Sequence, residues 1–369
     1  MSSKSETGFR PDYAVPPGET LKETLESLGM TQAQLADRTG RPKKTINEII
    51  KGKAAITAET SLQLERVLGI PAAFWNNLER NYQETLARLR EEDKLRSHVE
   101  WLKTFPVNAL IKAGWIKKAA SPVQQLQELL NFFGVAGVAE WRKQWESPQA
   151  VYRKSLAHAS NAHAIAAWLR KGDIEASKMT CQPFDAAAFQ KSLEQICRLT
   201  MEPPEKFQPR LKEACAAAGV AMIFVPELPK TRIFGATRWL TPNKAIIQLS
   251  LRGKSDDHLW FTIFHEAGHI LLHGKKAIFI NMGEDGCADG NLKNREELEA
   301  NRFASDFLIR PKPYKEFVGR ARFDNSSIKS FANEQGIATG IVVGRLQHDR
   351  VIPYSRGNSL KKRLSFARQ

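Results

Sequence analysis

The sequence has little cysteine and no long apolar run. Its four cysteines, Cys181, Cys197, Cys215 and Cys287, form no C-x-x-C pair. Such sparse thiols argue against a disulfide framework and favour a reducing compartment. Residues 1–13 lack the apolar core of a signal peptide, and no stretch approaches the length of a membrane span. We therefore expect a cytoplasmic protein that makes no contact with a membrane.

Acidic residues are fewer than basic ones. The chain has 55 Lys and Arg against 40 Asp and Glu, which gives a net charge of +15 and a pI near 9.7. This excess favours an anionic partner such as nucleic acid, although a merely soluble basic protein would have the same balance. The apolar share of 42% is that of an ordinary globular protein, and 369 residues suffice for two or three domains.

The region after the N-terminal tail has the pattern of a helix-turn-helix. An apolar stripe over residues 21–28 ends at Gly29, which predicts a first helix. Thr31 and Gln34 form a capping box that predicts the start of a second helix. A third, basic helix is predicted over residues 43–50. Two short helices joined by a tight turn are typical of DNA-binding modules.

The first turns of the third helix are the expected contact with DNA. Recognition helices of this type present their N-terminal side chains to base edges and phosphates. We predict that Lys43, Lys44, Thr45 and Asn47 bind double-stranded DNA there, and that Gln32 binds a backbone phosphate. The alternative is a small helical unit whose lysines are only solvated. Because such modules usually read paired half-sites, we also expect a homodimer.

This region resembles the HigA-type antitoxins of the Xre family of helix-turn-helix repressors. The resemblance is carried by Gly18-Glu19-Thr20-Leu21, Thr31-Gln32-x-x-Leu35-Ala36, Ile49-x-x-Gly52 and Leu68-Gly69-Ile70-Pro71-x-x-Phe74-Trp75. It implies an operator DNA as one partner and a toxin as another possible partner.

The most specific motif is an H-E-x-x-H over residues 265–269, inside a helical pattern that begins at Asp256. On a helix, His265 and His269 project from one face and can hold a single metal ion. Glu266 can then reach a water at the ion without being a ligand itself. The motif predicts a zinc hydrolase, and a chance match without metal is the alternative.

Two histidines do not complete a catalytic zinc site, which usually has three protein ligands. His273 continues the spacing, but on a straight helix it lies about 12 Å along the axis from His265. We therefore expect a carboxylate from a later helix, over residues 294–308. That helix offers Glu296, Glu297 and Glu299.

Residues 205–310 resemble the ImmA/IrrE family of metallo-endopeptidases. The resemblance is carried by Trp260-Phe261-Thr262-x-Phe264-His265-Glu266-x-Gly268-His269-Ile270-Leu271-Leu272-His273 and by Glu299-Ala300-Asn301-x-Phe303-Ala304. It implies zinc held by His265, His269 and Glu299, with Glu296 as the second choice of carboxylate. It further implies that Glu266 is the general acid–base. The reaction also needs a hydrogen-bond donor to the oxyanion. The sequence does not identify this donor, and His348 and Tyr314 are the candidates.

These patterns together predict a mainly α protein with an α+β zincin-like domain that contains a small, mostly antiparallel sheet. The expected parts are a disordered tail (1–15), a helix-turn-helix domain (16–95), a helical connector (96–202), the zincin-like domain (203–311) and a helical extension with a basic tail (312–369). The connector could join the two domains, mediate dimerisation or sense a ligand, and the sequence does not choose between these roles. The basic tail could contact DNA or simply be solvated.

Two functions remain open from the sequence. In the first, a DNA-binding regulator cleaves a specific regulatory protein at its zinc site. In the second, an antitoxin-like repressor uses its metallopeptidase-like domain to bind a partner or metal without cleaving. The intact Glu266 favours the first, because a pure binding domain does not need that carboxylate. Fusion to an antitoxin-like DNA reader favours the second.

Overall fold

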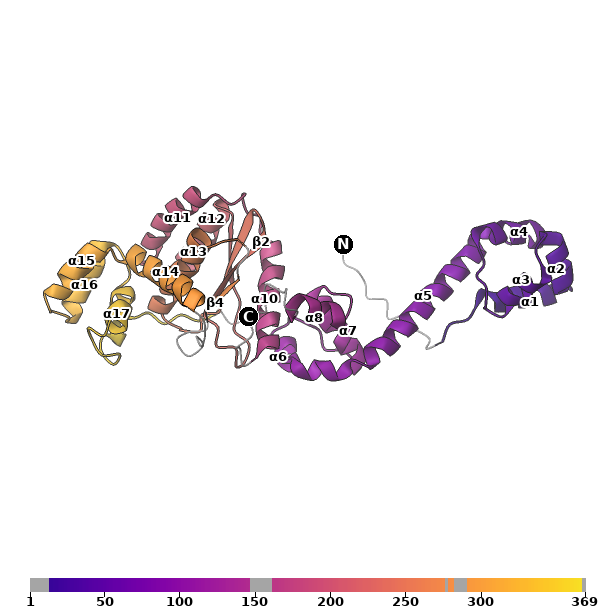
Figure 1. The fold of residues 1–369 in the computed structure, drawn as a ribbon, viewed down its shortest axis with the longest axis horizontal. Helices are drawn as coiled ribbons and strands as arrows, with labels where there is room; N and C mark the ends of the chain where they lie inside the picture. Colours follow the sequence, from indigo (N-terminus) through magenta and orange to yellow (C-terminus); the bar gives the residue numbers. More distant parts are fainter. Residues whose placement is uncertain (1–12, 147–160, 276–277, 282–290, 367–369) are drawn as a thin grey trace. The chain divides into compact units, whose positions relative to one another are not determined.

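The computed structural model describes residues 13–146, 161–275, 278–281 and 291–366. The chain divides into two compact units, Met1–Val99 and Glu100–Gln369 (Figure 1). Most of the predicted tail, Cys287 and the last three residues lie outside the described ranges. None of the described helices is long and apolar enough to cross a membrane.

The first unit is entirely helical. Its helices are α1 (Pro17–Ser27), α2 (Gln32–Thr39), α3 (Lys43–Ile50), α4 (Ala58–Leu68) and α5 (Ala72–Arg96). The predicted capping box is present, since the Thr31 hydroxyl accepts from the Gln34 N–H and the Gln34 side chain accepts from the Thr31 N–H. The core is made by Leu21, Leu35, Ile46 and Trp75, which are fully buried. The predicted helix-turn-helix arrangement of α2 and α3 is therefore confirmed.

The second unit begins with helices that pack around aromatic side chains. They are η1 (Val99–Thr104), α6 (Val107–Lys112), α7 (Pro122–Phe133), α8 (Val138–Trp145), α10 (Ala162–Ser177), α11 (Ala186–Leu199) and α12 (Pro204–Ala217). Trp141 lies edge-on to Trp101, Phe105 and Phe133, with ring centroids 5.1 to 5.6 Å apart. These contacts make a local aromatic core for η1, α7 and α8.

The sheet has four strands: β1 (Val220–Phe224), β2 (Gly235–Thr241), β3 (Lys244–Leu249) and β4 (Phe279–Asn281). Their order is β1-β3-β2-β4. β2 and β3 form an antiparallel hairpin and β4 pairs antiparallel with β2, whereas β1 runs parallel to β3. The sheet is thus mixed and mostly antiparallel, and the chain is mainly α as predicted.

Helix α10 packs against the sheet. The buried Arg238 of β2 pairs with Asp173 of α10 at 2.7 Å and donates to the Leu169 carbonyl. Gln248 of β3 donates to the Trp168 carbonyl on the same helix. Because side chains alternate along a strand, Arg238 faces α10 while its neighbour Thr237 faces the opposite side of the sheet. The predicted boundary at residue 202 therefore separates elements that pack together.

The motif helix and its partner cover that opposite side. They are α13 (Asp256–Leu272) and α14 (Asn291–Leu308), which lie side by side (Figure 1). The chain continues through α15 (Pro311–Gly319), α16 (Asn325–Gln335), α17 (Thr339–His348) and η3 (Asn358–Leu360). α17 also packs on α13.

The segment after η3 returns to the start of α13. The Asp256 N–H donates to the Lys362 carbonyl, and the Lys362 N–H donates to the Asp256 carboxylate. The Lys361 ammonium lies 2.6 Å from the Asp257 carboxylate, with side-chain exposures of 14% and 8%. The segment with Lys361 and Lys362 thus binds the first turn of α13. The Lys361 ammonium forms an ion pair within the protein and is not available to DNA.

We expect Lys361→Met to lower the free energy of unfolding by about 3 kcal/mol, because it leaves the buried Asp257 carboxylate without its counter-charge. Lys362→Met is the matched control. Its ammonium is exposed and, among the described residues, donates to the Met201 carbonyl, so the cost should stay below about 1 kcal/mol. Denaturant unfolding of both variants measures this, and equal losses would contradict a special role for Lys361.

Candidate metal centre and DNA-binding helices

Helix α13 carries the three motif side chains into the protein interior. His265, Glu266 and His269 are exposed by only 1%, 0% and 2%. Gly268 allows this burial, because a Cβ there would lie 3.2 Å from the Ala300 Cα on α14. The small pair of Gly268 and Ala300 therefore lets the two helices approach closely enough for α14 to contribute side chains to the site.

Three potential ligand side chains converge between the helices. The Nε2 atoms of His265 and His269 are 3.1 Å apart, and the Glu297 carboxylate lies 3.2 Å from the first and 3.5 Å from the second. In a tetrahedral zinc site with bonds of about 2.1 Å, ligand atoms are about 3.4 Å apart. Among the described residues, these three form the group that could hold a metal ion. The donor set and its spacing therefore fit zinc.

The predicted carboxylate Glu299 lies elsewhere. Its Oε2 is 3.3 Å from His273 Nε2, and its Oε1 accepts from the Arg295 guanidinium at 2.9 Å. Glu296 does not join the group either. The geometry instead favours Glu297, which sequence reasoning named among the three candidates but did not choose.

The position of Glu297 follows from the face that α14 turns to α13. Ala300 and Ala304 are fully buried on that face, and Asn301 contacts His265. Glu297 precedes Ala300 by three residues and Ala304 by seven, which is the spacing of one helical face. Glu299 is one residue from Ala300 and so points about 100° away. This periodicity is the signal in the sequence that could have identified Glu297.

The protonation states suit metal ligands. Burial lowers the pKa of His269 to about 4, which leaves a neutral imidazole. Burial would raise the pKa of Glu297, but the adjacent imidazoles of His265 and His269 lower it to about 2. For His265, burial lowers the pKa, yet the Glu297 carboxylate outweighs it and the net shift is upward. Metal binding at these side chains would therefore compete with protons.

Glu266 is buried beside this group, and one of its carboxylate oxygens accepts no hydrogen bond from the described residues. Its Oε2 accepts from the Thr237 hydroxyl at 2.6 Å, while its Oε1 is buried and has no hydrogen-bond partner among the described residues. A Cβ at Gly235 would lie 2.7 Å from that Oε1, so the strand needs glycine there. Burial raises the pKa of Glu266 to about 7. A carboxyl group with this pKa and a free oxygen can accept and return a proton near neutral pH.

We expect the metal-free protein to lose stability as the pH rises through this pKa. The folded protein holds the Glu266 proton up to about pH 7, whereas a carboxyl group of ordinary pKa 4.5 releases it earlier. Folding thus takes up a proton in this window, and the free energy of unfolding falls by about 3 kcal/mol between pH 4.5 and 7.

Glu266→Gln removes this titration and serves as the comparison. At pH 8 the chelated variant should be more stable than the chelated wild type by about 3 kcal/mol, and the difference should shrink toward pH 5. Denaturant unfolding at several pH values measures it. A difference that does not change with pH would contradict the raised pKa.

Strand β4 adds a side chain that sequence reasoning missed. The Phe279 ring stacks on the His269 imidazole, with centroids 4.0 Å apart and planes at 12°. This contact fixes the plane of the imidazole. A three-residue strand carries too short a pattern to be recognised in the sequence.

The two candidates for the oxyanion donor are engaged elsewhere. The Tyr314 hydroxyl donates to Asp349 at 2.9 Å, and His348 Nδ1 lies 3.1 Å from the other oxygen of that carboxylate. Burial raises the pKa of Tyr314 further from neutrality. Neither side chain contacts the group formed by His265, His269 and Glu297.

The predicted DNA contacts lie on α2 and α3. Lys43 and Lys44 are exposed, while Thr45 and Asn47 are half-buried on the same first two turns of α3. Gln32 is the first residue of α2.

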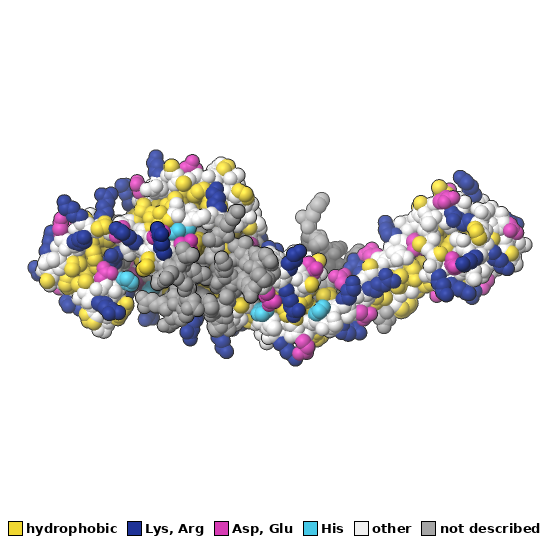
Figure 2. Space-filling model, in the orientation of Figure 1, with side chains coloured by type: hydrophobic (Ala, Val, Ile, Leu, Met, Phe, Trp, Pro, Cys, Tyr) yellow, Lys and Arg dark blue, Asp and Glu magenta, His cyan; other side chains and the backbone are white. Residues whose placement is uncertain are grey.

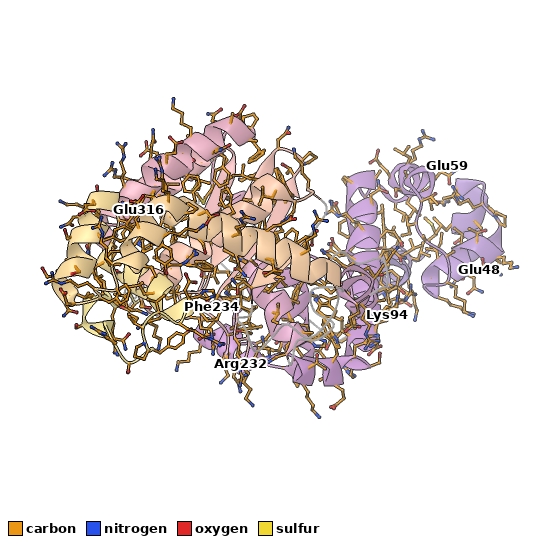
Figure 3. The ribbon with its side chains drawn as sticks, turned by 60° about the vertical axis from the view of Figure 1, so that its left-hand side comes forward. Glu48, Glu59, Lys94, Arg232, Phe234 and Glu316 are labelled. Atoms are coloured by element: carbon orange, nitrogen blue, oxygen red, sulfur yellow. The ribbon has the colours of Figure 1, made fainter. Side chains whose placement is uncertain are left out.

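Acidic side chains accompany them: Glu48 and Glu59 project outward from α3 and α4 (Figure 3). Lys44, 84% exposed, lies 3.9 Å from Glu48, a contact too exposed to hold the lysine away from a phosphate. On the face shown in Figure 2, Lys and Arg side chains are scattered over the described surface. On this face the positive charge therefore does not mark one patch.

Comparison with known proteins matches two separate parts of the chain to two families. Residues 21–75 match the family described as Helix-turn-helix, and residues 225–346 match the family described as IrrE N-terminal-like domain. Virulence-associated protein I of Dichelobacter nodosus is 37% identical over 82 residues, which are 22% of this chain and 73% of that protein. Antitoxin HigA-1 of Vibrio cholerae is 35% identical over 80 residues, 21% of this chain and 75% of that protein.

The chain belongs to the HigA-type helix-turn-helix family and carries an IrrE-like peptidase-family domain. A solved structure, an addiction module antidote protein of a HigA family from Coxiella burnetii, is 33% identical and covers 23% of this chain and 92% of that one, with a TM-score of 0.22. Each of these relatives covers less than a quarter of this chain. That region is a DNA-binding domain, and the IrrE-like domain has the fold of a metallopeptidase family.

Proposed function

We propose that this protein is a DNA-binding transcriptional regulator whose IrrE-like domain is a zinc-dependent endopeptidase acting on a specific regulatory protein. The observation that carries the proposal is the convergence of His265, His269 and Glu297 beside the open Oε1 of Glu266. A non-catalytic domain has no need of a buried carboxylate with an unused oxygen, because burying such a group is costly. Replacement of Glu266 by glutamine tests it.

The chain's own residues divide the chemistry between them. His265, His269 and Glu297 would hold zinc, which when bound polarises a peptide carbonyl and makes water more acidic. Glu266 takes the proton from the attacking water through its Oε1 and passes it to the leaving amine. The Thr237 hydroxyl holds the other oxygen and so fixes the carboxylate in this orientation.

The DNA-binding half suggests the class of substrate. A peptidase that shares a chain with an operator-binding domain works where regulatory proteins gather, so a protein of gene control is a better substrate than a nutrient peptide. Lys43, Lys44, Thr45 and Asn47 would contact the operator from α3, and Gln32 would contact a phosphate from the N-terminus of α2. We propose a homodimer, since helix-turn-helix proteins commonly read two half-sites.

We expect Lys43→Ala combined with Asn47→Ala to weaken binding to a duplex selected by the wild-type protein by roughly 10- to 1000-fold. Loss of one phosphate contact and one base contact accounts for this range. Lys94→Ala, an exposed lysine on α5, is the matched control and should bind normally. Fluorescence anisotropy at two salt concentrations measures both affinity and the reduced salt dependence. Unchanged binding by the double variant would remove α3 from the DNA interface.

A second function has its own support. The similarity to Antitoxin HigA-1 over the helix-turn-helix region favours a repressor that binds a toxin. In that case the IrrE-like domain would bind its partner or a metal without cleavage. Replacement of Glu266 then changes nothing in the cell, which separates the two proposals.

A further inference from the structure

A hydrogen-bond chain lies behind the ligand group, on the side away from its centre. His269 Nδ1 is 3.0 Å from His273 Nδ1, and His273 Nε2 is 3.3 Å from a Glu299 oxygen. The other Glu299 oxygen accepts from Arg295 at 2.9 Å. On the other imidazole, His265 Nδ1 lies 2.8 Å from Asn301 Oδ1. His265 and His269 thus each have one outer partner.

The chain has only one consistent direction of donation for neutral rings. The Glu299 carboxylate can only accept, so His273 Nε2 carries the proton. The Nδ1 of a neutral His273 then has a lone pair, and it must accept from the Nδ1–H of His269. The His269 proton is therefore on Nδ1, which leaves its Nε2 as a lone pair.

The same reasoning applies to His265. An amide oxygen can only accept, so His265 Nδ1 carries the proton and its Nε2 is a lone pair in the neutral ring. Both Nε2 atoms therefore turn lone pairs toward each other and toward the Glu297 carboxylate, at 3.1 to 3.5 Å. Such an arrangement of acceptors is suited to a cation at its centre.

We propose that His273, backed by Glu299, and Asn301 are positioning residues that fix the tautomer and direction of the two histidine ligands. This inference rests on the proposed metal site. In the segment Glu297-Leu298-Glu299-Ala300-Asn301, Glu297 is then the metal ligand. Glu299 is the outer hydrogen-bond partner of His273.

The backbone explains how His273 takes this place. It is the C-cap of α13, with φ −117° and ψ 161°, so the chain has left the helix and the ring can turn back to His269. Its side chain is only 5% exposed. A buried imidazole outside the ligand group, joined at both nitrogens, fits an orienting role, because outer partners of this kind govern metal affinity.

His273 also packs near Phe279, with ring centroids 5.2 Å apart, so the test must separate packing from hydrogen bonding. His273→Phe keeps an aromatic ring and removes the acceptor. His273→Asn loses the ring but can present its amide oxygen close to the former Nδ1 position. The hydrogen-bond role predicts that Asn restores what Phe loses, whereas packing predicts the reverse.

The experiment measures zinc affinity by chelator competition and the visible absorption of the cobalt(II)-substituted full chain. We expect His273→Phe to bind zinc 10- to 100-fold more weakly and to shift the cobalt bands, with His273→Asn close to wild type. Asn301→Leu should weaken zinc binding to a similar degree. Circular dichroism and DNA binding of each variant confirm that it is folded.

The outcomes separate this proposal from the metal site itself. If wild type binds one zinc ion and His273→Phe binds it equally well with the same cobalt spectrum, the positioning role is refuted and the site stands. If Phe is tolerated better than Asn, His273 acts by packing and the proposal fails. If the wild type binds no zinc, both the site and the positioning role fail.

Discussion

Glu266→Gln is expected to abolish cleavage while leaving zinc content and DNA binding at wild-type levels. Glutamine fills the same volume but cannot take a proton, and loss of a general base costs roughly 10²- to 10⁴-fold in rate. The residue is not among the converging ligand atoms, so metal binding should persist. Quantitative proteomics of protein N-termini, from cells that produce wild type or variant, measures the cleavage products.

The matched control is Thr237→Val, which removes the hydroxyl that holds Glu266 but keeps the carboxylate. It should retain part of the activity, because the base is present but poorly oriented. If cells with Glu266→Gln show the same protein N-termini and the same phenotype as wild type, the peptidase proposal fails. The repressor that binds without cleaving would then be the better account.

Glu297→Gln is expected to have the second large effect, the loss of tightly bound zinc. An amide is a far weaker zinc ligand than a carboxylate, and the two buried imidazoles alone leave the site with two protein ligands instead of three. We expect zinc affinity to fall by more than the roughly 10- to 100-fold that loss of an outer partner costs. Elemental analysis after dialysis against a weak chelator measures it.

Glu296→Gln is the matched control, because this neighbouring carboxylate does not belong to the group. It should keep one zinc ion per chain. If Glu297→Gln keeps its zinc and Glu299→Gln loses it, then the carboxylate implied by the family resemblance is the ligand. The arrangement of α14 described above would then be incorrect.

The parts that could be predicted from the sequence are those specified locally. The capping box at Thr31 and Gln34 fixes the start of α2 through side chains three residues apart. The H-E-x-x-H spacing works in the same way, since one helical turn brings His265 and His269 together wherever the helix lies. Both features need no knowledge of tertiary structure.

The third carboxylate could not be chosen as easily, because its position depends on how two helices cross. Glu297 and Glu299 both lie on α14, and the close contact of Gly268 with Ala300 decides which of them faces His265 and His269. A sequence phrase names both residues without that contact. Only the spacing of Glu297 to the buried Ala300 and Ala304 indicates the answer.

Contacts between segments far apart in the sequence also could not be predicted. The ion pair of Asp173 with Arg238 joins residues 65 positions apart, so no local pattern shows that α10 belongs to the sheet. The parallel pairing of β1 with β3 is non-local in the same way, since β2 intervenes in the chain. The contact of Asp173 with Arg238 packs α10, an element of the expected connector, against the sheet of the domain that carries the site.

The most direct test of the metal site is anomalous diffraction at the zinc edge from crystals of Glu266→Gln grown with zinc. We predict a single strong peak about 2.0–2.2 Å from the Nε2 atoms of His265 and His269 and from a Glu297 oxygen. No peak between these three side chains, or a peak bound to Glu299 instead of Glu297, would contradict this account.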